Sequence, residues 1–159
     1  HWRFILNHAG LWLALFAGFV GSASEQTLRL PVFRDKPNNE AFTSQGRTVF
    51  LDKPFQLKEF AVEHYADGTP RHFFADIIVD EQVIRLEVNH PYSAGWGEDY
   101  YLTSYDMRSP EPAYCVVQIV REPLKYVMLA GIIMMLVGGF LLFLEGPKRS
   151  DASSAEKQN

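Results

Sequence analysis

The chain has 159 residues, of which 47% are hydrophobic and 21% are charged, with a net charge of −4 and a mean hydropathy of −0.10. These averages resemble an ordinary soluble domain, but the chain mixes very unlike segments. No basic stripe is present, which excludes nucleic acid as a serious partner. The single cysteine, Cys115, excludes both an internal disulfide and Cys-x-x-Cys exchange, and its apolar neighbours predict a small buried side chain.

The first predicted element is a transmembrane helix within residues 1–22. Its apolar run, 4–20, would be roughly 26 Å long as a helix, close to the ~30 Å hydrocarbon core of a bilayer. The small residues at 21–24 also fit a signal-peptide cleavage site. We favour a membrane span, because the apolar core is longer than a usual signal core. Asn7 and His8 are polar exceptions near its start.

Residues 23–122 predict an antiparallel all-β domain, packed as a sandwich or barrel, because strand-like runs alternate with short turns. In 82–89, Ile84 and Leu86 alternate with Val83 and Arg85, the period of a half-buried strand. Residues 52–54 are expected to separate the first two strands, and 89–97 to form a loop. The predicted strands are 47–51, 55–65, 71–79, 82–89, 100–105 and 113–120.

A second transmembrane helix is predicted within 123–145. Its run 126–144 contains no charged residue, and only four residues, 121–124, separate it from the last strand. The sheet is therefore expected to lie close to the membrane surface. The polar remainder, 146–159, predicts a disordered tail.

The short flanks predict the orientation. Arg3 precedes the first span, while Lys148, Arg149 and Lys157 follow the second, so the positive-inside rule puts both termini in the cytoplasm and the β domain outside. The chain begins at His1 and not at methionine, and we expect it to be part of a longer gene product.

Four segments along the chain form a recognisable series. They are the first span with its exit, 3–24; the segment 60–65 with the turn 67–70; 87–91 followed by 100–106; and the closing strand and helix, 116–143. Together and in this order, these segments resemble the ResB family of cytochrome c biogenesis proteins, also called CcsB. Typical members carry more spans and a larger exported domain, so the chain resembles a reduced or split form.

The resemblance implies a subunit of a haem export and apocytochrome c haem-attachment complex in the bacterial inner membrane. The implied partners are a CcsA-like multi-span protein, apocytochrome c and the lipid bilayer, and the cofactor is haem shared with that partner. The tryptophan-rich motif of CcsA is absent, since 96–99 is only superficially similar. We therefore expect scaffolding or chaperoning and no catalysis by this chain alone. An accessory subunit of a respiratory or transport complex without haem handling, and a membrane-anchored sensor, are the alternatives.

His8 is the first candidate for a haem ligand, because an imidazole inside an apolar span needs a hydrogen bond or a metal. The alternative is that Asn7 and His8 lie at the membrane rim or hydrogen-bond to a neighbouring helix. His90 is a second candidate, although Asn89 and Pro91 on either side favour a turn. We expect no catalytic residue and no further metal site.

A seam of small residues in the second span predicts a surface for a partner helix. Glycines allow close helix packing, and this pattern recurs along one face. The alternative is general lipid-exposed packing of this face. The predicted interface consists of Gly131, Met135, Gly138 and Leu142.

Overall fold

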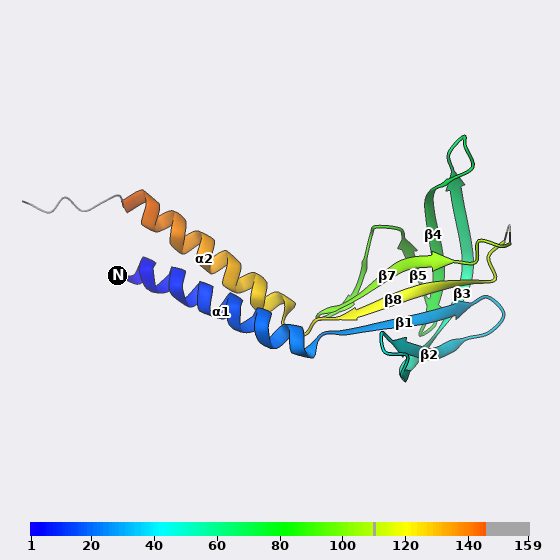
Figure 1. The fold of residues 1–159 in the computed structure, drawn as a ribbon, viewed down its shortest axis with the longest axis horizontal. Coiled ribbons are helices and arrows are strands. Elements are labelled where there is room, and N and C mark those ends of the chain that lie inside the picture. Colours follow the sequence, from blue (N-terminus) through cyan, green and yellow to red (C-terminus); the bar gives the residue numbers. More distant parts are fainter. Residues whose placement is uncertain (110, 146–159) are drawn as a thin grey trace, which may run out of the picture. The chain divides into compact units, whose positions relative to one another are not determined.

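The computed structural model describes residues 1–109 and 111–145, so the predicted cytoplasmic tail, 146–159, lies outside the described residues. The chain divides into two compact units (Figure 1). The helical unit consists of His1–Val20 and the residues from Leu124 onward, and the β unit consists of Gly21–Pro123.

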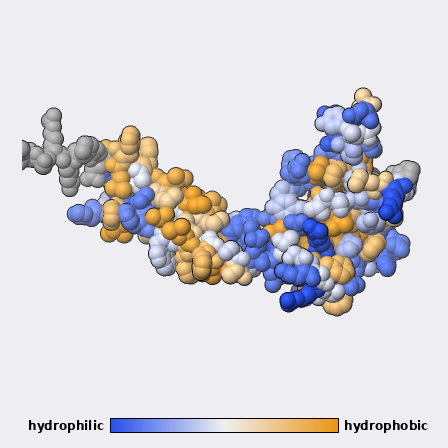
Figure 2. Space-filling model, in the orientation of Figure 1, coloured by the Kyte–Doolittle hydropathy of each residue, from blue (hydrophilic) through white to orange (hydrophobic). Residues whose placement is uncertain are grey.

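Two helices form where the apolar runs predicted them. Helix α1 covers Trp2–Ser24 and helix α2 covers Lys125–Glu145. By length and composition, both are able to cross a membrane. Figure 2 shows mostly hydrophobic residues on the surface of the helices and mainly hydrophilic residues on the β unit.

The β unit is an eight-stranded antiparallel sheet with the strand order β5-β4-β3-β2-β1-β8-β7-β6. This confirms the predicted antiparallel all-β class. The strands are β1 (Gln26–Phe33), β2 (Asn38–Thr43), β3 (Thr48–His64), β4 (Pro70–Val79), β5 (Gln82–Glu87), β6 (Tyr92–Gly95), β7 (Glu98–Tyr105) and β8 (Tyr114–Arg121).

Three details of the predicted strand pattern are wrong. Strands β1 and β2 were not predicted, and β6 occupies part of the expected loop 89–97. Residues 48–64 form one strand and not two. Its pairing with β2 shifts register between Phe50 and Phe55, so the expected break at 52–54 is instead a bulge in a continuous strand.

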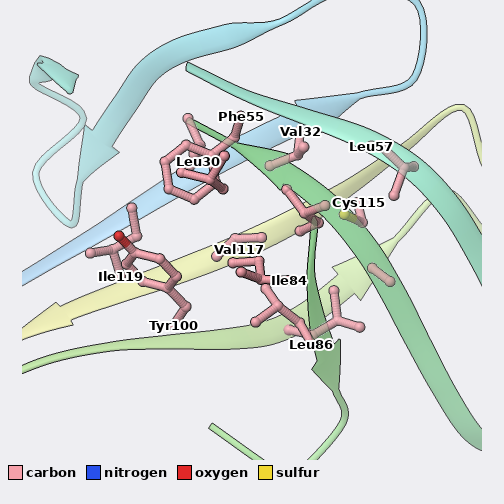
Figure 3. Packing of buried hydrophobic residues seen from close by; sticks show 14 of the residues in the cluster. Leu30, Val32, Phe55, Leu57, Ile84, Leu86, Tyr100, Cys115, Val117 and Ile119 are labelled. Carbon is pink, nitrogen blue, oxygen red and sulfur yellow. The ribbon is translucent and has the colours of Figure 1, made fainter. Parts of the chain in front are cut away.

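The sheet curls, so that residues from distant strands share one core (Figure 3). Phe55 of β3 packs its ring edge against Tyr100 of β7 with 5.4 Å between centroids, and Phe60 lies 4.8 Å from Tyr105. Cys115 is fully buried in this core, as predicted. The largest of the fully buried side chains are Phe55, Leu28, Leu30, Leu57, Ile77, Leu86, Ile119, Val32, Val117 and Cys115.

The β4–β5 hairpin forms as the sequence predicted. Asp80 and Glu81 adopt φ angles of 53° and 64°, which a two-residue turn of this twist requires. In β5, Ile84 and Leu86 are buried while Val83 is exposed, which confirms the predicted alternation.

Candidate functional site

The two helices pack through small residues. A Cβ atom on Gly131 of α2 would lie 2.5 Å from the backbone nitrogen of Ala14 and 2.9 Å from the Gly10 carbonyl oxygen, both in α1. A Cβ on Gly10 would meet the backbone of Met135 and Gly131 just as closely. The two backbones are therefore in direct contact, an arrangement common between helices in lipid, where close van der Waals packing drives association.

Asn7 adds a hydrogen bond to this contact. Its Nδ2 donates to the Met135 carbonyl oxygen at 2.8 Å, and its backbone lies against Gly138. The hydrogen bond satisfies a polar side chain in an otherwise apolar helix. This is the alternative expected for Asn7, a hydrogen bond to a neighbouring helix.

The predicted interface in α2 faces α1 of the same chain over most of its length. Gly131 and Gly138 are buried against α1, and the backbone of Met135 accepts the bond from Asn7. Leu142, the fourth residue of this seam, is partly buried. The seam thus serves a helix–helix contact, and the second helix belongs to this chain.

His8 lies next to Asn7 in sequence but is exposed. Its Nδ1 lies 2.9 Å from the Phe4 carbonyl oxygen one turn earlier, and the two ring centroids are 3.8 Å apart with the ring planes tilted by 32°. A carbonyl oxygen can only accept, so Nδ1 must carry the proton and donate. In the neutral ring, Nε2 is then the nitrogen with the lone pair, and it has no hydrogen-bond partner among the described residues.

This is the state in which a histidine binds a metal. Metal-ligating histidines commonly donate one ring N–H to a carbonyl or carboxylate, which fixes the tautomer and turns the other nitrogen toward the metal. The Phe4 carbonyl oxygen accepts a hydrogen bond from His8 Nδ1 in the same way.

Large apolar side chains surround His8 on the exposed face of α1. They recur at spacings of three and four residues, which puts them on one side of a helix. Trp12 and Phe16 stack with 5.2 Å between ring centroids. The exposed stripe, called the His8 face below, consists of Phe4, His8, Leu11, Trp12, Leu15, Phe16 and Phe19.

His90, the second candidate ligand, lies in a tight turn of the β unit. The preceding Asn89 has a φ of 63°, and the His90 amide donates to the Glu87 carbonyl at 3.1 Å. Its exposed ring lies 3.2 Å from the Val88 carbonyl. The expected turn is therefore present at His90. Over residues 1–109 and 111–145, no three His, Cys, Asp or Glu side chains gather in a group that could hold a metal ion.

The polar side chains of the β unit form structural pairs. Arg85 donates to both carboxylate oxygens of Asp76, at 2.7 and 2.8 Å, and this hydrogen bonding lowers the pKa of Asp76. Arg121 and Tyr100 both donate to Glu98, while burial raises the pKa of the Tyr100 hydroxyl. The Arg85–Asp76 and Arg121–Glu98 pairs join neighbouring strands, whereas Tyr100 and Glu98 both lie in β7.

The thiol of Cys115 is equally unsuited to reaction. Burial raises its pKa to about 12, so it stays protonated at neutral pH. The arrangement of the β unit thus gives no reactive nucleophile at this position.

The small residues of α1 and the extent of the His8 face were not identified from the sequence. Gly10 is a lone glycine in an apolar run, and its meaning depends on α2, more than a hundred residues later. The periodic spacing of aromatic residues 4, 12, 16 and 19 was the available signal for the exposed face.

Comparison with known proteins gave a family and a structural likeness. The family model described as the ResB-like family matches residues 1–114. Among solved structures, a protein titled "Cytochrome c Heme Lyase CcmF" resembles this chain with a TM-score of 0.56 and 12% sequence identity. The likeness covers 91% of this chain but 24% of that protein, and at this identity it concerns the fold alone. No curated protein sequence matched.

Proposed function

The chain belongs to the ResB-like family, and from that premise we propose that it is a membrane subunit of a cytochrome c maturation complex. The fold that it shares with part of a cytochrome c haem lyase supports this link. The chain spans about a quarter of that protein, so its proposed role is that of one part of a larger assembly. In that assembly it scaffolds haem transfer and does not catalyse thioether formation alone.

In this proposal α1 and α2 cross the bacterial inner membrane. Their length and composition support insertion, as does their packing through small residues with apolar side chains outside. The termini lie in the cytoplasm and the β unit lies outside, following the basic flanks. The β unit then stands where haem is attached to an apocytochrome, which it could hold.

The partner contact is assigned to the His8 face. In α2, Gly131 and Gly138 already contact α1, so this part of the predicted interface is occupied. The His8 face instead exposes aromatic side chains around one imidazole. A CcsA-like multi-span protein is the partner proposed to cover it.

The observation that carries the haem role is the state of His8. Its Nδ1 is held by the Phe4 carbonyl, its Nε2 lone pair is available, and flat apolar rings lie beside it. These residues fit haem as a transported substrate: His8 would supply a ligand to the iron, and the aromatic side chains would contact the macrocycle. A second ligand would come from the partner.

The test is the haem content of the complex purified with its membrane partners. His8→Ala is expected to lower the Soret absorbance per complex several-fold and to reduce the yield of mature cytochrome c. Added imidazole should restore part of both, because it replaces the missing ligand without restoring any packing.

His64→Ala is the matched control, since it removes an exposed histidine from the β unit. His90→Ala tests the second candidate in the same assay. An unchanged spectrum in His8→Ala would remove the ligand role and leave a scaffold. Failure to recover any haem-containing partner would contradict the proposed complex as a whole.

A further inference from the structure

The turn between β6 and β7 folds onto the end of β8. The Glu122 amide donates to the Gly97 carbonyl at 2.6 Å, and the indole Nε1 of Trp96 donates to the Pro123 carbonyl at 2.9 Å. Two adjacent residues of the turn thus hold two adjacent residues of the chain just after β8.

Gly97 permits this contact in two ways. Its φ of 66° lies in the left-handed region, and a Cβ there would overlap the Glu122 carbonyl group and lie 3.2 Å from the Pro123 Cα. The turn is therefore built to bring its backbone against residues 122 and 123. Because Gly97 follows Trp96 directly, this contact also keeps Trp96 next to residues 122 and 123.

The ring of Trp96 is exposed although its polar group is already satisfied. Its exposed fraction is 71%, whereas Phe55 and Tyr100 are 2% and 8% exposed in the core. An indole whose N–H is hydrogen-bonded presents mainly apolar surface. The fold thus keeps a large apolar ring outside the core of the β unit.

The chain places this ring close to the start of α2. Pro123 is separated from Lys125, the first residue of α2, by Leu124 alone, and two peptide steps span at most about 8 Å. Lys125 and Tyr126 lie at this boundary, with the Lys125 Nζ 5.5 Å from the Tyr126 ring centroid. Tryptophan, tyrosine and lysine are the residue types that anchor proteins at the headgroup level of a bilayer.

We propose that the β6–β7 turn is a lipid-interface anchor, with the Trp96 ring between the headgroups and the upper acyl chains. The proposal rests on the membrane insertion of α2 proposed above. The anchor gives the edge strand β6 an attachment to the bilayer that does not depend on a partner protein. The Trp96–Pro123 hydrogen bond ties this attachment to the chain entering α2.

Tryptophan fluorescence of the full chain in phosphatidylcholine vesicles tests the proposal. The chain has three tryptophans, so Trp2→Phe with Trp12→Phe leaves Trp96 as the reporter, and Trp2→Phe with Trp96→Phe leaves Trp12 in α1. Quenching is measured with lipids brominated near the headgroup, with lipids brominated deep in the chain, and with aqueous iodide. We expect the shallow bromine to quench Trp96 more than the deep bromine, with little quenching by iodide.

The Trp12 reporter separates the two proposals. If Trp12 is quenched by brominated lipid while Trp96 responds only to iodide, the anchor is wrong and membrane insertion stands. If neither tryptophan responds to brominated lipid, both proposals are wrong. The measured Trp96 is unaltered in its own reporter chain, so its native turn is retained.

Discussion

The two units of the chain place their apolar residues in opposite ways. In the β unit the large side chains, such as Phe55 and Leu30, are inside, and the surface is mainly polar. In the helical unit the inside holds Gly10, Ala17 and Gly131, and phenylalanine, leucine and tryptophan lie outside. The first pattern suits water, and the second suits a surrounding that is itself apolar.

The difference shows what holds each unit together. Burial of apolar surface from water, worth about 25 cal/mol per Å², stabilises the curled sheet. The α1–α2 pair has little such area to bury, so it depends on close backbone approach and on the Asn7 hydrogen bond. Substitutions of the same type should therefore act differently in the two units.

The largest effect is expected from Phe55→Ala in the core. Removing a buried phenylalanine leaves a cavity, and the β unit should lose about 3–5 kcal/mol of unfolding free energy. Chemical denaturation of the protein in mild detergent, followed by circular dichroism of the sheet, measures the loss. Phe143→Ala makes the same change at a residue of α2 that is 83% exposed, and it should change the unfolding free energy by less than about 0.5 kcal/mol. Equal losses would contradict the opposite arrangement of the two units.

The next largest effect is expected from Gly131→Ala, which adds one methyl group between the helices. The new Cβ would meet the Ala14 backbone, which cannot move as a side chain does, so the α1–α2 pair should weaken by about 1–3 kcal/mol. Titration with sodium dodecyl sulfate, with fluorescent probes on the two helices, reports their separation. Gly18→Ala is the control, because its Cβ would meet only the flexible Met128 side chain at 3.8 Å. If the helices of Gly131→Ala separated at the same detergent concentration as the wild-type helices, close backbone contact between α1 and α2 would be excluded.

A smaller effect is expected from Asn7→Ala. The change removes the hydrogen bond to the Met135 carbonyl, worth about 0.6–2 kcal/mol between helices in lipid. The same detergent titration measures it. His8→Ala changes the neighbouring residue on the exposed side and should leave the helix pair intact while lowering haem content. If both variants weakened the pair equally, the two faces of α1 would not be distinct.

The smallest effect is a dependence of β-unit stability on pH through Asp76. Its pKa is lowered in the folded state by the hydrogen bonds from Arg85, so the pair stabilises the fold above the ordinary aspartate pKa of 3.8. That contribution is lost as the pH falls through the lower, folded-state pKa. The loss should be on the order of 1 kcal/mol, since Arg85 is half exposed. Denaturation midpoints are measured between about pH 6 and about pH 2.5, a range that includes the titration of aspartate. The midpoint should fall less in Asp76→Asn than in wild type.

The sequence predicted those elements whose signal is local. A charge-free run long enough to cross a membrane can be recognised without knowing which segment it packs against. The same holds for the alternation of buried and exposed residues in the strand that follows Asp80 and Glu81. Strand β6 has four residues, all exposed, and so carries no hydrophobic pattern to detect. Strand β1 was missed because it contains Pro31, and proline is unfavourable in a central strand. In the structure β2 pairs with β1 only at residues 28 and 29, and at Pro31 the ladder continues with β8 alone.

The candidate site could be predicted only in part for the same reason. His8 stands out as an imidazole in an apolar run, but its exposure follows from which face of α1 meets α2. Gly10 and Asn7 form that face because they contact the backbone of α2, and Asn7 is bonded to Met135, 128 residues later in the chain. Such a pairing leaves no trace in local spacing.

Strands β1 and β8 are neighbours, and Gln26 at the start of one is paired with Arg121 at the end of the other. The β unit therefore begins and ends at adjacent points, separated by about 5 Å, the spacing of paired strands. Such a unit behaves as a cassette inserted into a helical hairpin, which a short turn could replace without stretching the chain. Natural variation in this family could then enlarge, exchange or shed the β unit while the helices stay the same.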